Sequence, residues 1–76
     1  MIFIDNKAVG ERIAYLRVNN HYTREEFAEI IGISSKFLYE IEIVKKKFSV
    51  DILYNIATSF GVSCDYLIIG VHMLEE

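Results

Sequence analysis

Apolar residues recur along this 76-residue chain at spacings of three and four, the period of an α-helix that buries one face. In "VGERIAYLR", for example, Val9, Ile13 and Leu16 share one side of a helix, with charged residues between them. Glycine and asparagine positions interrupt the pattern and divide the chain into five predicted helices. They cover about residues 7–19, 23–31, 34–42, 49–60 and 64–69. The pattern therefore predicts an all-α fold.

A side chain that can cap a helix precedes each of the five segments. Oxygens of Ser, Thr, Asp and Asn accept hydrogen bonds from the unpaired amides of a helix's first turn. In "TREE" the cap is reciprocal, because the Glu26 side chain can reach back to the amide of Thr23. The expected caps are Asp5 or Asn6, Thr23, Ser34, Ser49 and Ser63.

The stretch "EFAEIIGISSKFLYEIE" has the placements that a helix-turn-helix requires. Two helices that cross closely need a small residue at the crossing, and Ala28 supplies it. Four residues later, Gly32 can take the positive φ of a tight turn. These agreeing placements favour a DNA-reading motif over a generic helical hairpin with a glycine turn. The side chains expected to face the core are Phe27, Ile30, Ile31, Leu38 and Ile41.

Composition predicts one small globular domain, residues 1–76. The chain is 53% hydrophobic and 25% charged, contains no proline and has four glycines, which favours helices with short turns. A chain this short buries a modest core, so dimerisation would help it. The single cysteine, Cys64, suits a reducing cytoplasm. No apolar run approaches the roughly 20 residues of a membrane-spanning helix, so a cytoplasmic protein is expected.

Four segments resemble, in the family's order, the Cro/repressor-type or xenobiotic-response-element helix-turn-helix family: "VGERIAYLR", "TREEFAEIIGIS", "YEIE" and "IATSFGVSCDYLIIG". The resemblance covers about residues 9–70. It implies a compact five-helix bundle of the lambda-repressor type, with a core at about 7–70, the motif at about 24–43 and a tail at 71–76. Family members are mostly transcriptional repressors that bind double-stranded operator DNA as dimers, with the motif's second helix in the major groove. The resemblance thus implies a homodimeric repressor of an inverted-repeat operator, with no cofactor, membrane or small-molecule ligand.

The resemblance also implies roles for individual residues. The positions that face the bases are Ser35, Lys36, Tyr39 and Glu40; a lysine prefers guanine O6/N7, and a carboxylate can accept from cytosine N4. The positions that contact phosphates are Arg24, Ser34, Lys45, Lys46 and Lys47. Arg17 and Glu42 match a pair that forms an ion bridge between the first and third helices.

The dimer surface is expected near the end of the fifth helix. The stretch "YLIIGVHML" has more apolar residues than one helix face can bury inside. In the family this helix often mediates dimerisation, which implies a surface that includes Tyr66, Ile69 and Val71. The alternative is ordinary core packing followed by a tail.

The acidic balance of the chain is unusual for a DNA-binding protein. The formal net charge is −3. Residues 24–47 carry five basic and five acidic side chains and net zero, so the remainder of the chain carries the deficit. The face that carries Ser35, Lys36, Tyr39 and Glu40, here called the reading face, can therefore be locally positive on a protein whose net charge is negative. Few phosphate contacts would imply a shallow dependence of DNA affinity on salt.

The chain departs from the family pattern at several positions, and one is His21, which replaces the glycine often found before the second helix. Val44 and Phe48 stand where the family usually has glycine and later proline, and valine is poor at positive φ. The third helix is therefore expected either to run a turn longer or to lead into a loop of different path, which affects the placement of the lysines at 45–47.

Other functional classes remain as alternatives. A helix-turn-helix fold that binds a protein instead of DNA would suit an outward face of Tyr39, Glu40 and Ile43. An antitoxin-type or restriction-controller-type regulator is a variant within the DNA-binding class. An enzyme or a metal site is not expected, because His21, His72 and Cys64 fall on different elements without ligand spacing or a nucleophile–base pair.

Overall fold

The computed structural model describes residues 4–70 of the chain. No strand occurs in this range, and the all-α class expected from the periodicity is confirmed. The helical elements are α1 (Asn6–Asn19), α2 (Arg24–Ile31), α3 (Ser35–Tyr39), the π-helical turn η1 (Glu40–Val44), α4 (Val50–Phe60) and α5 (Cys64–Ile69).

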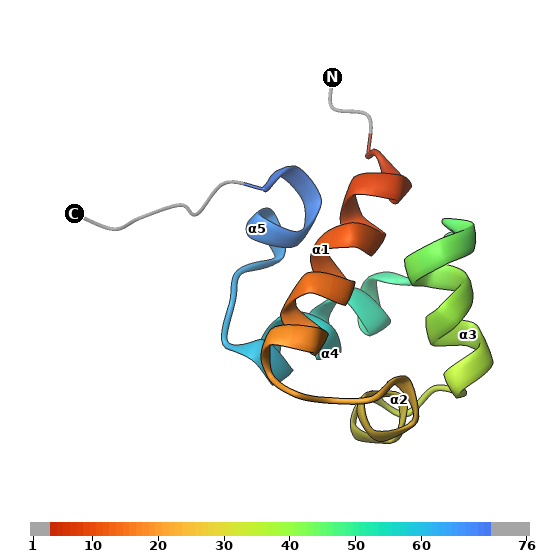
Figure 1. Ribbon diagram of the computed structural model, residues 1–76. Coiled ribbons are helices and arrows are strands. Elements are labelled where there is room, and N and C mark those ends of the chain that lie inside the picture. The colour runs from red at the N-terminus through yellow and green to blue at the C-terminus, as the bar shows by residue number, and fades with distance from the viewer. Residues whose placement is uncertain (1–3, 71–76) are drawn as a thin grey trace.

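The helices pack around a single apolar core, with α1 at its centre (Figure 1). One side of α1 contacts η1 and another contacts α5, while α4 packs against α2 and α5. The ring of Phe27 in α2 stacks on that of Phe60 in α4, with 4.5 Å between the ring centroids. Every helical element contributes to the core; its largest fully buried side chains are Val9, Ile13, Phe27, Leu38, Ile41, Ile56 and Leu67.

The expected N-caps are confirmed, with Asp5 as the cap of α1. The Thr23 hydroxyl accepts from the amide of Glu26 at 3.0 Å, and the Glu26 carboxylate accepts from the amide of Thr23 at 2.9 Å. Each cap satisfies amides that the helix itself leaves unpaired. Local sequence therefore sets where each helix begins.

Ile30 was expected to face the core, and this prediction is wrong. Its side chain is 51% exposed. Phe27, Ala28 and Ile31 form the buried stripe of α2. At about 100° per residue, Ile30 falls outside that stripe. The apolar spacing alone allowed two overlapping stripes, and packing against α3 and α4 selects one of them.

The third helix was expected to end at about residue 42 or to run a turn longer, and the helical path continues two residues further, to Val44. The Glu40 carbonyl accepts from the Lys45 amide, five residues further on, and from the Lys46 amide at 3.0 Å. This wider turn moves the positive φ onto Lys45, where φ is 69°. An unbranched lysine tolerates that conformation better than the β-branched valine before it.

His21, in the turn between α1 and α2, also has a positive φ, of 64°. We expect His21→Gly to raise the free energy of unfolding by a few tenths to about 1 kcal/mol, because glycine removes the steric cost of this conformation. Thermal unfolding should show the gain as a higher Tm. His21→Ala keeps the Cβ atom and should gain nothing. Equal stabilisation by both substitutions would contradict a conformational origin.

Candidate nucleic-acid interface

The corner between α2 and α3 is closed by backbone hydrogen bonds at Gly32. Gly32 has a φ of 79°, and its N–H donates to the Ala28 carbonyl at 2.9 Å. The N–H of Ile33 donates to the same oxygen at 3.0 Å. Ala28 is buried, with 2% of its surface exposed. This corner fixes the direction of α3, whose inner face is anchored by Leu38.

The outer face of α3 and the start of η1 carry the four residues expected to face bases. Lys36 and Tyr39 are exposed, whereas Ser35 and Glu40 are half-buried. A shallow depression of about 480 Å³ lies on this face. The side chains that line it are Ser34, Lys36, Phe37, Glu40 and Lys46.

Beneath this face, a buried carboxylate joins three elements. The Arg17 guanidinium of α1 donates to Glu42 of η1 through Nε (2.8 Å to Oε2) and Nη2 (3.1 Å to Oε1). Its Nη1 donates to the Tyr22 carbonyl at 2.8 Å. This is the geometry of the ion bridge that the family resemblance implies for Arg17 and Glu42. Among the described residues, no buried side-chain nitrogen or oxygen lacks a hydrogen-bond partner.

A second arginine, Arg24 of α2, shares the same carboxylate. Its Nε lies 2.8 Å from Glu42 Oε1, and its side chain is 33% exposed. Its guanidinium carbon lies 5.2 Å from the centroid of the Tyr39 ring, within cation–π range. Arg24, which is expected to contact phosphate, thus touches Tyr39, which is expected to contact bases. No local spacing in the sequence signals this contact.

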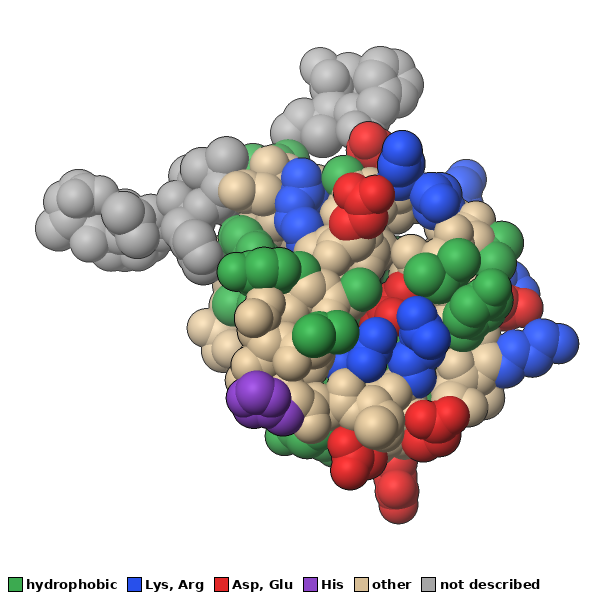
Figure 2. Space-filling model, in the orientation of Figure 1, with side chains coloured by type: hydrophobic (Ala, Val, Ile, Leu, Met, Phe, Trp, Pro, Cys, Tyr) green, Lys and Arg blue, Asp and Glu red, His purple; other side chains and the backbone are tan. Residues whose placement is uncertain are grey.

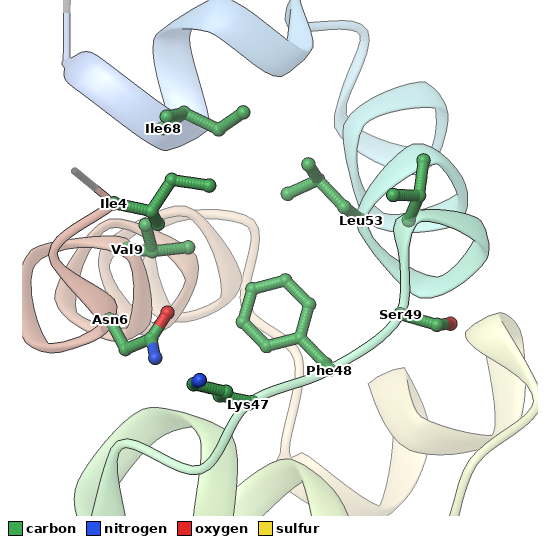
Figure 3. A pocket seen from close by; sticks show the side chains of 9 residues that line it. Ile4, Asn6, Val9, Lys47, Phe48, Ser49, Leu53 and Ile68 are labelled. Carbon is green, nitrogen blue, oxygen red and sulfur yellow. The ribbon is translucent and has the colours of Figure 1, made fainter. Parts of the chain in front are cut away.

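The three lysines that follow η1 do not converge on one place. Lys45 donates from Nζ to the Ile43 carbonyl at 2.9 Å, at the end of η1. Lys46 Nζ lies 3.2 Å from Glu40 Oε1, back against the outer face of α3. Lys47 is exposed and lines one side of an apolar pocket beside the N-terminal end of α1 (Figure 3).

That pocket has a volume of about 420 Å³ and lies between α1, α4 and α5. The ring of Phe48 points into it from the loop before α4, facing Leu53 (Figure 3). Phe48 therefore contributes apolar surface to the loop at a position where the family usually has proline. The other lining residues are Ile4, Asn6, Val9, Lys47, Ser49, Val50 and Ile68.

The residues expected at a dimer surface lie on or beyond α5. Tyr66 is half-buried and Ile69 is 42% exposed, while Val71 lies outside the described residues. Arg12 of α1 donates from Nη1 to the carbonyls of Leu67 and Ile68, at 2.8 and 3.0 Å. This arginine satisfies carbonyls at the end of α5, a role that its place among the polar residues of α1 did not suggest.

Charges of both signs are interspersed over the face formed by α1 and α3, and acidic side chains gather at the end occupied by α2 (Figure 2). Within residues 4–70, no helix is long and apolar enough to cross a membrane. The same range contains no group of three or more His, Cys, Asp or Glu side chains that could hold a metal ion.

A family model described as a helix-turn-helix domain matches residues 10–72. The SPbeta prophage-derived uncharacterized HTH-type transcriptional regulator YonR of Bacillus subtilis is 30% identical over 63 residues, which are 83% of this chain. Those residues are 58% of YonR, so the chain spans little more than half the length of that relative.

Solved structures with the same fold include two DNA-binding regulators. The N-terminal DNA binding domain of SinR from Bacillus subtilis matches with a TM-score of 0.75 and 26% identity, covering 91% of this chain and 99% of that one. The P22 c2 repressor, solved with a synthetic operator, matches with a TM-score of 0.77 and 22% identity, covering 83% and 96%. The expected repressor-type bundle of five helices is thereby confirmed.

Proposed function

Because the chain belongs to the Cro/repressor-type helix-turn-helix family of transcriptional regulators, which are not enzymes, we propose that it is a cytoplasmic repressor that binds double-stranded DNA sequence-specifically. The observation that carries this proposal is the outer face of α3. Lys36 and Tyr39 are exposed on this outer face, while the buried Leu38 anchors the opposite, inner face of the helix. The major groove of B-DNA is about 12 Å wide and admits an α-helix.

We assign base contacts to the four residues on this face. Lys36 suits the O6 and N7 acceptors of guanine, and the Glu40 carboxylate can accept from the N4 amino group of cytosine. Side chains four apart on a helix lie on one row, so Lys36 and Glu40 can address neighbouring bases. The base-contacting set is Ser35, Lys36, Tyr39 and Glu40.

We assign phosphate contacts to residues on both sides of the reading face. Arg24 begins α2 and lies against Tyr39 of α3, and Lys46 contacts Glu40 at the outer face. Each cationic phosphate contact contributes about 0.9 to the slope of log affinity against log salt, so the four cations of this set imply a slope of about 3.6 per monomer. The phosphate-contacting set is Arg24, Ser34, Lys45, Lys46 and Lys47.

We further propose that the protein binds an inverted-repeat operator as a homodimer through Tyr66, Ile69 and Val71. The 42% exposure of Ile69 at the end of α5 supports this surface. Two copies related by a two-fold axis match a palindromic operator, with half-sites about one helical turn apart. Sedimentation that shows only monomer at tens of micromolar would contradict the dimer.

A protein-interaction module is the second candidate, because the outer face also exposes apolar surface. Tyr39 is 45% and Ile43 is 44% exposed, and aromatic side chains are enriched at protein interfaces. This candidate predicts no affinity for any duplex, even at low salt, so one experiment separates the two.

The test is in-vitro selection of random duplex DNA at low salt, with the wild-type protein and with Lys36→Glu. We expect the wild type to enrich an inverted repeat and Lys36→Glu to bind it about 100-fold or more weakly. Removing one base interaction from each of two half-sites costs about 1–3 kcal/mol per half-site, and the new carboxylate also repels phosphates.

Lys7→Glu is the matched control, because it makes the same charge change at an exposed site in the first turn of α1. It should retain most of the affinity. Thermal unfolding must show that both variants are folded. Equal reductions of affinity in the two variants would point to the overall charge and contradict base reading by Lys36. Failure of the wild type to retain any duplex would favour the protein-interaction module.

A further inference from the structure

We propose that Arg24 is a positioning residue for base recognition: it sets the orientation of the Tyr39 side chain on the reading face. This inference rests on the proposed DNA-binding function and deepens it. It gives Arg24 a part in sequence preference that is separate from any contact with phosphate.

The first observation is that Arg24 is anchored to a fixed point. The Glu42 side chain is fully buried, and Arg17 holds its carboxylate through two hydrogen bonds. Arg17 is itself fixed by the carbonyl of Tyr22. The 2.8 Å contact from Arg24 Nε to Glu42 Oε1 is therefore a charge-assisted hydrogen bond to a partner that cannot move away.

The second observation is that the anchored guanidinium lies against the Tyr39 ring. With Nε directed at Glu42, the guanidinium carbon lies 5.2 Å from the ring centroid. Tyr39 is 45% exposed, so much of its surface has no protein neighbour that could hold it. Long side chains on a helix choose between two χ1 rotamers, and a contact with one of them selects it. The anchored arginine supplies such a contact.

The neighbouring base-contacting residue, Glu40, has no comparable support. Its partner Lys46 is 56% exposed in its side chain, and the distance between Nζ and Oε1 is 3.2 Å. Because the lysine is mostly exposed, this ion pair holds Glu40 only weakly, and the other contact of Lys46 Nζ is with the half-buried Phe37 ring, 5.6 Å from its centroid. Lys46 therefore serves as a control for Arg24, since both cations touch the reading face and only one is tied to a buried group.

The variant Arg24→Lys distinguishes the two roles proposed for the arginine, which are contact with phosphate and orientation of the Tyr39 side chain. Arg24→Lys keeps the positive charge and can still contact a phosphate. It lacks the planar fork that reaches Glu42 with one edge while its face covers a ring. The substitution should therefore release Tyr39 while retaining the electrostatic part of DNA binding.

The first measurement needs no DNA. NMR three-bond couplings report the χ1 rotamer of Tyr39, and nuclear Overhauser effects report contact between the Arg24 Hε and the Tyr39 ring. We expect one dominant rotamer in the wild type and in Lys46→Met, and averaged couplings in Arg24→Lys. A Tyr39 that keeps a single rotamer in Arg24→Lys would overturn the proposal.

The second measurement compares sequence preference and salt dependence. Selection on random duplex DNA with Tyr39→Ala first identifies the operator positions that depend on Tyr39. We expect Arg24→Lys to reduce the preference at those positions by about tenfold, the range of one base contact, with an unchanged salt slope. An unchanged preference at those positions, whether or not the affinity falls uniformly over all sequences, would show a phosphate contact alone and overturn the proposal.

The two measurements also separate failure of the inference from failure of the proposed function. A wild-type protein that enriches no sequence refutes the DNA-binding function, and the recognition role of Arg24 with it. The rotamer result then still decides whether Arg24 orients Tyr39. An operator that the wild type enriches and Arg24→Lys enriches with the same preferences refutes the inference alone.

Discussion

Replacing Glu42 by alanine is expected to lower the free energy of unfolding by about 3–5 kcal/mol, which is a large share of the stability of a small domain. The carboxylate accepts from Arg17 and Arg24, and the Arg17 side chain is only 10% exposed. Without Glu42, Arg17 would remain buried beside another cation and without a counter-charge. Its desolvation would then be uncompensated.

Denaturant unfolding of Glu42→Ala measures this decrease. The control is the double variant Arg17→Met/Glu42→Met, which removes both buried charges and keeps apolar volume in their place. It should recover most of the stability, because a well-packed apolar pair often replaces a buried ion pair at little cost. Arg24, with 33% of its side chain exposed, can turn toward water. A double variant as unstable as the single one would contradict the uncompensated-charge explanation.

The substitution Gly10→Ala is expected to cost about 1–3 kcal/mol, the usual range for overpacking a core. A Cβ atom at this position would clash with the carbonyl oxygen of Ile41 and would lie 3.1 Å from that of Glu42. Both obstacles are backbone atoms of η1, so no side chain can move aside. Helices α1 and η1 would have to separate, which would also disturb the contact between Arg17 and Glu42.

Thermal and denaturant unfolding test this prediction, and Gly10→Val should be destabilised more than Gly10→Ala. The sign of the effect is informative. In an unhindered helix, alanine is more favourable than glycine by about 0.5–1 kcal/mol. A gain in stability for Gly10→Ala would therefore contradict the close approach of the two elements.

Much of the fold could be predicted because its signals act over a few residues. The capping hydroxyl of Thr23 and its partner Glu26 are three residues apart, and Gly32 closes a turn within its own neighbourhood. The end of the third helix was harder to predict. It depended on whether Val44 would take a positive φ, and the wider turn of η1 transferred that conformation to Lys45.

Some features of the candidate site could likewise be predicted from local spacing, and others could not. The outward direction of Lys36 and Tyr39 follows from helical spacing once Leu38 is known to face the core. The same spacing did not decide that Ile30 is exposed, because two stripes of α2 were nearly equally apolar. Only the packing of α2 against its neighbours distinguished them.

Where the helices begin, the order of the motif's parts and the family of the chain follow from the amino-acid sequence, and the family resemblance also predicted that Arg17 meets Glu42. Two other long-range contacts became visible with the packed helices: Arg24 with Glu42, 18 residues apart, and Arg12 with the end of α5, 55 residues away. Capping and turn signals act between neighbouring residues and can be read in order along a chain. A contact between helices depends on how both are packed, and no spacing along the chain encodes it.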